Sequence, residues 1–177
     1  MAASAILWGM DSRLQRHAHI LHSVLLWAVI VGALGLIVFG SWMLAHKITT
    51  QTAQVTIGKA TFSTKLARTD AELERGLGGV RELQSKEGML FIFNTPDEWT
   101  IWMKGMRIPI DIIWLDENKK VVHIERNVQP DAHPYIVYAP PEPAKYVLEL
   151  KAGAAQRYSI TTGSTALFVL PPKKDAR

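Results

Sequence analysis

One carboxylate interrupts an otherwise apolar part of the sequence. Asp111 stands inside residues 108–114 (IPIDIIW). Because an unpaired buried carboxylate is costly, Asp111 is expected to pair with a cation, to accept backbone N–H groups, or to face a pocket. The nearest basic residues are Lys104 and Arg107. Two interpretations therefore stay open, a structural carboxylate that joins strands and a carboxylate that binds ligand or takes part in catalysis.

Glu149 is the second candidate acid. In residues 146–151 (YVLELK), the alternation of a strand places Glu149 on the same face as Val147 and Lys151, a pattern typical of a solvent-exposed face. Glycosidases use two carboxyl groups as general acid and base, so Asp111 and Glu149 together define a hydrolase alternative. That chemistry depends on the separation of the two carboxyl groups, which the sequence does not give.

Other common catalytic arrangements are missing from the sequence. With no cysteine among its 177 residues, the chain has no thiol nucleophile, disulfide or cysteine-ligated metal. The spacing of His123, Glu125 and His133 matches no helix-based metal motif, which favours surface histidines. No glycine-rich phosphate loop precedes a predicted helix. We therefore assign no catalytic residue, no metal and no cofactor, and we favour a role other than that of an enzyme.

The net charge of +4 comes from the two ends of the chain. Residues 51–170 hold 14 basic and 14 acidic residues, so this part is neutral. A protein that binds nucleic acid is expected to carry an excess of Lys and Arg on its folded domain. The charge distribution therefore excludes nucleic acid as the expected partner.

An apolar segment near the N-terminus predicts a single membrane-spanning helix. Residues 23–45 contain no charged side chain and would span about 34 Å as a helix, against a hydrocarbon core of roughly 30 Å. Trp27 and Trp42 lie near its two ends, as interfacial aromatic residues do. We expect a tail over residues 1–22, an uncleaved anchor in the lipid bilayer over 23–45, and a linker over 46–54. A short N-terminal tail usually stays inside, so the C-terminal domain is expected outside the cytoplasm, on a single-pass protein of the cell membrane.

The remaining sequence predicts one all-β domain over residues 55–170, followed by a basic tail over 171–177. Residues 53–58 and 60–67 predict a hairpin, and Thr69 with Glu72 forms a capping-box pattern for a short helix near 70–77. The connections look too short for the crossovers of a parallel sheet, so a sandwich or jelly-roll-like architecture is expected. Seven further short strands are predicted, over residues 88–93, 100–104, 110–115, 120–125, 135–139, 145–150 and 165–170.

Four segments carry a resemblance to a known family. They are residues 75–83 (RGLGGVREL), 87–93 (EGMLFIF), 99–116 (WTIWMKGMRIPIDIIWLD) and 145–153 (KYVLELKAG). In this order they resemble the bacterial and archaeal family known as domain of unknown function 192, over nearly the whole predicted domain. The resemblance implies an all-β, jelly-roll-like sandwich, exported or at the membrane, of unknown activity. The chain departs from the family pattern at two places. It has Gly78 where the family often has Met, and it has Gly105 and Met106 where the family often has Asn and Thr.

The polar positions of these motifs define the candidate ligand-binding set, to which an aromatic neighbour is added: Arg75, Arg81, Trp102, Lys104, Asp111 and Glu149. Trp99 and Arg107 are expected on the same face. Aromatic rings beside cations suit sugars and anions. The favoured hypothesis is a membrane-anchored binding or accessory module for a small polar ligand or an envelope component. The alternatives are a structural domain that docks a partner in a membrane complex, and a hydrolase that uses Asp111 and Glu149.

Overall fold

The computed structural model describes residues 27–39, 51–130 and 136–173. The chain divides into two compact units, residues 1–49 and residues 50–177, each of which is described by itself.

In the first unit, residues 27–39 form a helix whose side chains are all exposed. Several are large and apolar, among them Trp27, Leu36 and Val38. Within the described residues no helix has both the length and the apolar character needed to cross a membrane. The predicted membrane helix over 23–45 lies outside the described residues at both of its ends, and the tail over 1–22 lies wholly outside them. The anchor therefore stays a prediction.

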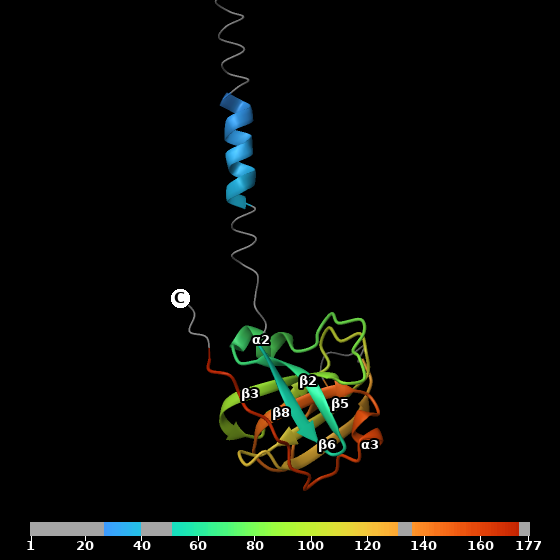
Figure 1. Ribbon diagram of the computed structural model, residues 1–177. Coiled ribbons are helices and arrows are strands. Elements are labelled where there is room, and N and C mark those ends of the chain that lie inside the picture. Colours follow the sequence, from blue (N-terminus) through green and yellow to red (C-terminus); the bar gives the residue numbers. More distant parts are fainter. Residues whose placement is uncertain (1–26, 40–50, 131–135, 174–177) are drawn as a thin grey trace, which may run out of the picture. The chain divides into compact units, whose positions relative to one another are not determined.

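The second unit is an all-β domain, as predicted. Its main sheet contains six strands in the order β1-β2-β3-β8-β5-β6, and β4 and β7 form a separate small sheet. Figure 1 labels β2, β3, β8, β5 and β6 of the main sheet. The six strands of the main sheet are β1 (Thr52–Ile57), β2 (Ala60–Ala67), β3 (Glu87–Asp97), β5 (Ile110–Leu115), β6 (Val121–Val128) and β8 (Ala144–Lys151). The small sheet pairs β4 (Ile101–Trp102) with β7 (Val137–Tyr138), so nearly all the strand structure lies in one sheet rather than in two facing ones.

One expectation about the sheet is wrong. β2 and β3 are parallel, with Ser63 opposite Glu87 and Ala67 opposite Phe91. The connection over residues 68–86 is long enough for the crossover that a parallel pair needs, and it includes the short helix α2 (Asp70–Arg75). The crossover places α2 over one face of the sheet, where it becomes a wall of the site described below.

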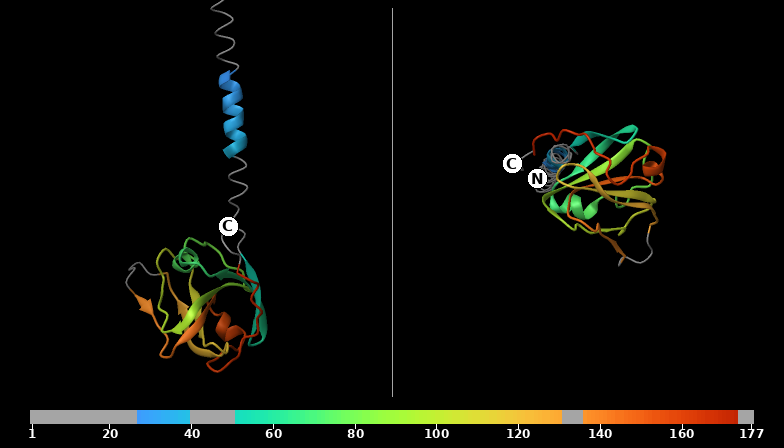
Figure 2. Two further views of the ribbon diagram at one scale, coloured as in Figure 1. Left: turned by 90° about the vertical axis from the view of Figure 1, so that its left-hand side faces the viewer. Right: turned by 90° about the horizontal axis from the view of Figure 1, so that it is seen from below.

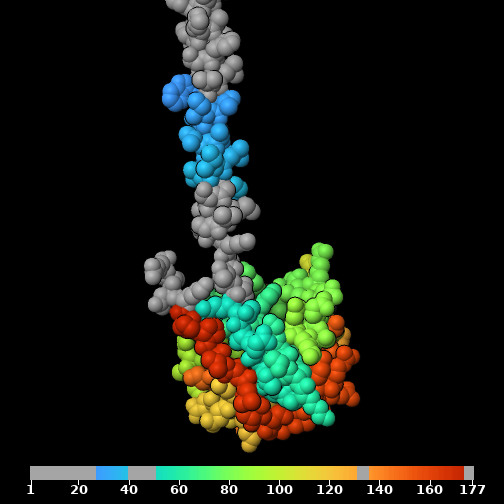
Figure 3. Space-filling view, in the orientation of Figure 1, coloured from blue at the N-terminus to red at the C-terminus, as the bar shows by residue number. Residues whose placement is uncertain are grey.

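The C-terminal segment closes the other face. Residues 165–170 do not form a regular strand as predicted; two isolated bridges, Thr56 to Leu167 and Lys120 to Thr165, connect this segment to β1 and to the start of β6. Figure 3 shows the segment lying beside β1 on the surface. A second short helix that the sequence did not predict, α3 (Ala154–Arg157), precedes it, and Figure 2 shows α2 and α3 well separated in the domain.

Both faces of the sheet are consequently buried. Strand alternation directs Leu90, Ile113 and Leu148 into one apolar core, beneath α3 and the C-terminal segment. Phe91, Ile112 and Val147 point into a second core, which packs against residues of α2 and of the segment that contains β4. All six residues of β5 are buried, so any polar side chain in the central strands needs a special arrangement.

Candidate functional site

A cleft of about 250 Å³ lies beside the second core. Its floor comes from β3 and β8, one wall from α2 and the turn after it, and the other wall from the segment around β4. The residues that line it are Leu73, Glu74, Arg75, Gly76, Leu77, Phe91, Phe93, Thr100, Ile101, Trp102, Lys104, Met106 and Glu149.

The α2 wall begins with the predicted capping box. The Thr69 hydroxyl accepts a hydrogen bond from the Glu72 N–H, and the Glu72 carboxylate accepts from the backbone N–H groups of Arg68 and Thr69 at 2.9 and 3.0 Å. Partial burial acts to raise the pKa of Glu72, but these hydrogen bonds outweigh it and the pKa is lowered. The cap fixes the start of the helix, which therefore enters the crossover at a defined position.

The helix ends at Arg75, earlier than the predicted Leu77, because the backbone turns at the C-cap residue Gly76 with φ of +49°. A Cβ at this position would lie 3.1 Å from Phe91 Cζ and 3.8 Å from Glu149 Oε2. Glycine allows both the backbone conformation and the close approach to Phe91. It also leaves the Glu149 carboxyl open to the cleft.

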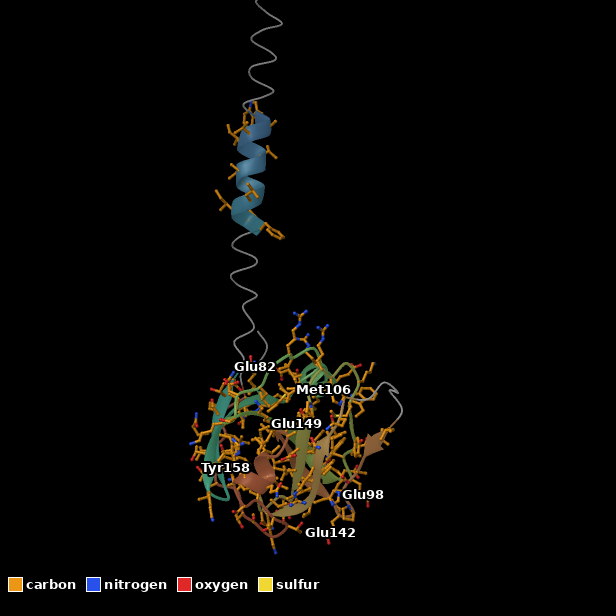
Figure 4. The ribbon with its side chains drawn as sticks, turned by 90° about the vertical axis from the view of Figure 1, so that its right-hand side faces the viewer. Glu82, Glu98, Met106, Glu142, Glu149 and Tyr158 are labelled. Carbon is orange, nitrogen blue, oxygen red and sulfur yellow. The ribbon has the colours of Figure 1, made fainter. Side chains whose placement is uncertain are left out.

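Glu149 lies at the base of the cleft. The residue is 3% exposed. In the sheet it pairs with Met89 of β3 on one side and with Ile112 of β5 on the other. Alternation does place it on the face of Val147, but the expected exposure of that face is wrong, because α2 and the turn after it cover this end of β8. Oε2 has no hydrogen-bond partner among the described residues. Figure 4 shows Glu149 inside the domain near Met106, which lines the same cleft.

Burial raises the pKa of Glu149 to about 8. The side chain is therefore mainly protonated at pH 7. An uncharged carboxyl group both donates and accepts hydrogen bonds, whereas a carboxylate only accepts. The cleft thus holds, at its base, a polar group that can form a hydrogen bond and has no partner for its buried oxygen.

Two cations line the same cleft and are exposed, Arg75 at the end of α2 and Lys104 after β4. Lys104 Nζ lies 4.9 Å from the centre of the Trp102 ring, a cation–π distance, and Trp102 is 40% exposed. In the described part of the chain the single ion pair joins His123 and Glu125, so neither Arg75 nor Lys104 is neutralised by a described acidic partner. Glu74 is exposed and lines the cleft too, so the exposed charged groups of the cleft are two cations and one carboxylate.

Asp111 does not belong to this site. Its Oδ1 accepts hydrogen bonds from the N–H groups of Asn127 (2.8 Å) and Gly153 (3.1 Å), and its Oδ2 accepts from Ala155 (2.8 Å). The side chain is fully buried, on the face opposite the cleft. Asp111 thus connects β5 to β6 and to the N-terminus of α3, and the structure does not bring it together with the other residues of the predicted ligand-binding set. The structural interpretation of this carboxylate is the one that the hydrogen bonds support.

The acid–base pair of the hydrolase alternative is not formed either. Glu149 pairs with Ile112 across the β5–β8 ladder, and Asp111 pairs with Leu150. Neighbouring residues of a strand point to opposite faces, so the two carboxyl groups lie on opposite sides of the sheet. No common solvent-open cleft can contain both.

Three further residues of the predicted binding face lie outside the cleft. Arg81 and Arg107 are exposed and do not line it. Trp99 stacks on Phe93, with the ring centres 4.2 Å apart, and its indole N–H donates to the Thr95 carbonyl. The structure therefore brings together four of the six predicted residues, namely Arg75, Trp102, Lys104 and Glu149.

Sequence reasoning missed the apolar floor of the cleft. Phe91 and Phe93 alternate along β3 and so share a face, a signal that was present in residues 87–93. What the sequence did not show is that the neighbouring crossover would leave this face open to a cleft.

His123 and Glu125 form a surface pair, with Nε2 and Oε1 2.9 Å apart. Within the described residues no group of three potential metal ligands occurs, and His133 lies outside them.

Comparisons with known proteins identify the family. Solved structures with a similar fold include the following two. A protein from Sinorhizobium meliloti 1021, described as a "putative transcription regulator", superposes with a TM-score of 0.65 at 26% identity, covering 69% of this chain and 97% of that one. A protein of unknown function from Novosphingobium aromaticivorans DSM 12444 gives a TM-score of 0.60 at 32% identity, over 69% of this chain and 89% of that one.

The sequence model of the family DUF192, described as "Uncharacterized ACR", matches residues 53–168. The chain belongs to this family, which confirms the predicted resemblance. No protein with curated annotation matches the chain.

Replacing Asp111 by Ala is expected to destabilise the domain by about 3 kcal/mol, because three backbone N–H groups, that of Ala155 fully buried, would lose a charged acceptor. Urea unfolding of the wild type and the variant, followed by circular dichroism, measures the difference. Asp70→Ala, at an exposed position of α2, is the control for losing an aspartate. A difference below about 1 kcal/mol between Asp111→Ala and the wild type would contradict the structural role assigned to Asp111.

The raised pKa of Glu149 makes stability depend on pH. Between the ordinary value of 4.5 and about 8 the folded state binds more protons than the unfolded state, so the free energy of unfolding falls as pH rises through this range. The stabilising contribution of the protonated Glu149 is fully present below pH 4.5. Its loss at higher pH lowers the free energy of unfolding by several kcal/mol.

We expect that Glu149→Gln does not lose stability in this way, because glutamine does not titrate. Its free energy of unfolding should therefore rise relative to that of the wild type from pH 5 to pH 8. Urea midpoints measured at several pH values test the expectation. Glu142→Gln, at an exposed glutamate, is the control and should follow the wild type. Parallel pH curves for the wild type and Glu149→Gln would show that Glu149 is not protonated in the folded protein.

Proposed function

We propose that this domain is a binding module whose cleft takes a small ligand, with the Glu149 carboxyl as the buried polar contact. The observation that carries the proposal is the unpartnered Oε2 at the base of the cleft. A buried polar atom without a hydrogen bond costs roughly 1–3 kcal/mol. A ligand that supplies the missing hydrogen bond recovers that free energy on binding.

The surroundings of Glu149 are those of a small-molecule site. Phe91, Phe93 and Trp102 provide apolar surface, and a few polar groups converge on the same space. A binding role is favoured over hydrolysis because the sheet separates Asp111 from Glu149.

A role in binding DNA is not part of the proposal. The description of the Sinorhizobium meliloti protein concerns that protein. In this chain the 14 basic residues of positions 51–170 are balanced by 14 acidic ones, which does not favour contact with a polyphosphate backbone.

Nuclear magnetic resonance with the full chain tests the binding site. A library of small fragments of mixed charge and polarity is added, and the indole N–H signal of Trp102 reports binding in the cleft. We expect fragments that shift this signal in the wild type to bind at least about fivefold more weakly to Glu149→Leu, which keeps the burial but removes the hydrogen bond.

The indole N–H groups of Trp99 and Trp114 donate to backbone carbonyls, so their signals serve as internal controls away from the cleft. Binding that shifts other signals but not Trp102, or equal affinity for Glu149→Leu, would overturn the proposed site.

We propose further that residues 23–45 anchor the chain in the membrane and that the binding domain lies outside the cytoplasm. The support is the run of uncharged residues and the exposed apolar side chains of the helix over 27–39. Such side chains are costly in water and favourable in lipid. A tethered module would meet its small polar ligand, or an envelope component, at the membrane surface.

Expression of the full chain in a bacterium checks the anchor. We expect the protein to remain in the membrane pellet after alkaline carbonate extraction. Leu34→Arg combined with Val38→Arg should release it, because each arginine near the centre of a span costs about 3 kcal/mol. A C-terminal alkaline phosphatase fusion should be active, since that enzyme folds outside the cytoplasm. An extractable wild type would contradict the anchor, and an inactive fusion on a membrane-bound chain would contradict the orientation.

A further inference from the structure

The charges around the cleft specify the ligand further, on the basis of the proposed function. We propose that the cleft binds an amphipathic organic anion, whose apolar body packs on Phe91 and Phe93 while its anionic group meets Arg75 and Lys104 at the mouth. An uncharged polar group of the same ligand, such as an amide, forms the hydrogen bond with Glu149.

The base and the mouth of the cleft differ in exposure. Glu149 is almost completely buried, whereas Arg75 and Lys104 are exposed, although all three line the same cleft. A ligand that reaches Glu149 from solvent therefore passes an exposed rim that contains the two cations together with Glu74 and Trp102. Its inner end meets an apolar floor and its outer end meets positive charge.

The mouth selects between two kinds of ligand that a buried carboxyl could accept. An amine could form an ion pair with an ionised Glu149, and an uncharged polar group could form hydrogen bonds with a protonated one. Arg75 and Lys104 disfavour an amine on its way into the cleft. Glu74 also lines the cleft, but it offsets only one of the two positive charges. The balance at the mouth favours an anion.

The two cations are available for a ligand. Neither forms an ion pair within the described part of the chain, and Lys104 is held over the Trp102 ring. Arg75 and Lys104 also line a second, more open hollow, together with Ala71, Glu74 and three glycines, Gly78, Gly79 and Gly105, so two positive charges face one negative charge there as well. The cations thus stand where the cleft opens to solvent, and glycines leave space for a ligand group beside them.

The protonation state of Glu149 is also compatible with an anionic ligand. The groups that face it from the covering elements are Glu74 and Arg75 of α2 and Lys104 of the β4 segment, while its sheet neighbours Met89 and Ile112 carry no charge. Burial is what raises its pKa, so a protonated Glu149 does not repel an anion at neutral pH. Above pH 8 the ionised side chain would oppose the anion, and affinity should fall.

Three matched probes test the sign of the charge. Phenylacetylglycine is an anion with a phenyl body and an amide, phenylacetylglycinamide is its neutral form, and N-aminoethyl phenylacetamide carries a cation in the same place. Each is titrated into the full chain at pH 6.5, with the Trp102 indole signal as the readout. We expect the anion to bind about five- to tenfold more tightly than the neutral amide, and the cation more weakly than both.

Substitutions test whether Arg75 and Lys104 cause the preference for the anionic probe. Lys104→Met combined with Arg75→Met should bring the anion and the neutral amide to the same affinity, while the neutral amide binds as it does to the wild type. Arg81→Gln, which removes a cation that does not line the cleft, is the matched control and should preserve the preference. Between pH 6.5 and pH 9 the anion should lose affinity for the wild type but not for Glu149→Gln.

The inference is overturned if the neutral or cationic probe binds as tightly as the anion, if the double variant weakens all three probes equally, or if none of them moves the Trp102 signal at millimolar concentration. These results leave the proposed function to be decided by the mixed fragment library. A library hit that is uncharged or cationic, depends on Glu149 and ignores Arg75 and Lys104 would keep the binding site and reject its preference for anions.

Discussion

Burial of both faces of the central sheet is the constraint on which the rest of this domain depends. A sheet that is apolar on both sides must be covered on both sides. On one side the cover is α3 with the C-terminal segment, and on the other it is α2 with the segment around β4. The single parallel pair follows from the same constraint, because the crossover from β2 to β3 carries α2 onto the second face.

The two carboxyl groups in the central strands show two solutions to the problem of a buried acid. Asp111 receives three backbone N–H groups, so its charge is satisfied by fixed dipoles and its geometry joins three elements. Glu149 has no such donor at Oε2 and is held in the uncharged form by its surroundings. The first arrangement is complete without a ligand. The second leaves a hydrogen bond unmade at a residue that lines the cleft, and this difference is the reason that the proposed ligand contact is Glu149 and not Asp111.

Local patterns in the sequence were sufficient for the fold class, most strands and the start of α2. The capping box at Thr69 and Glu72 depends on four neighbouring residues, so it is visible in the sequence. Of the six residues chosen from the family motifs and their aromatic neighbour, Arg75, Trp102, Lys104 and Glu149 line one cleft, whereas Arg81 and Asp111 do not. Alternation correctly placed Glu149 on the face of Val147. It could not show whether that face is covered, because the cover comes from a crossover distant in sequence.

The misplacement of Asp111 has the same origin. Its three donors lie 16, 42 and 44 residues away. Two of them, the N-cap Gly153 and Ala155, belong to the N-terminus of α3, a helix of four residues without a side-chain cap that the sequence could have indicated. In the sequence an aspartate in an apolar strand is equally compatible with a pocket and with a network of backbone donors. Only the tertiary fold decides between them, through the face on which the side chain emerges. Since β5 and β8 pair in register, one residue of offset between Asp111 and the partner of Glu149 is enough to place the two acids in different environments.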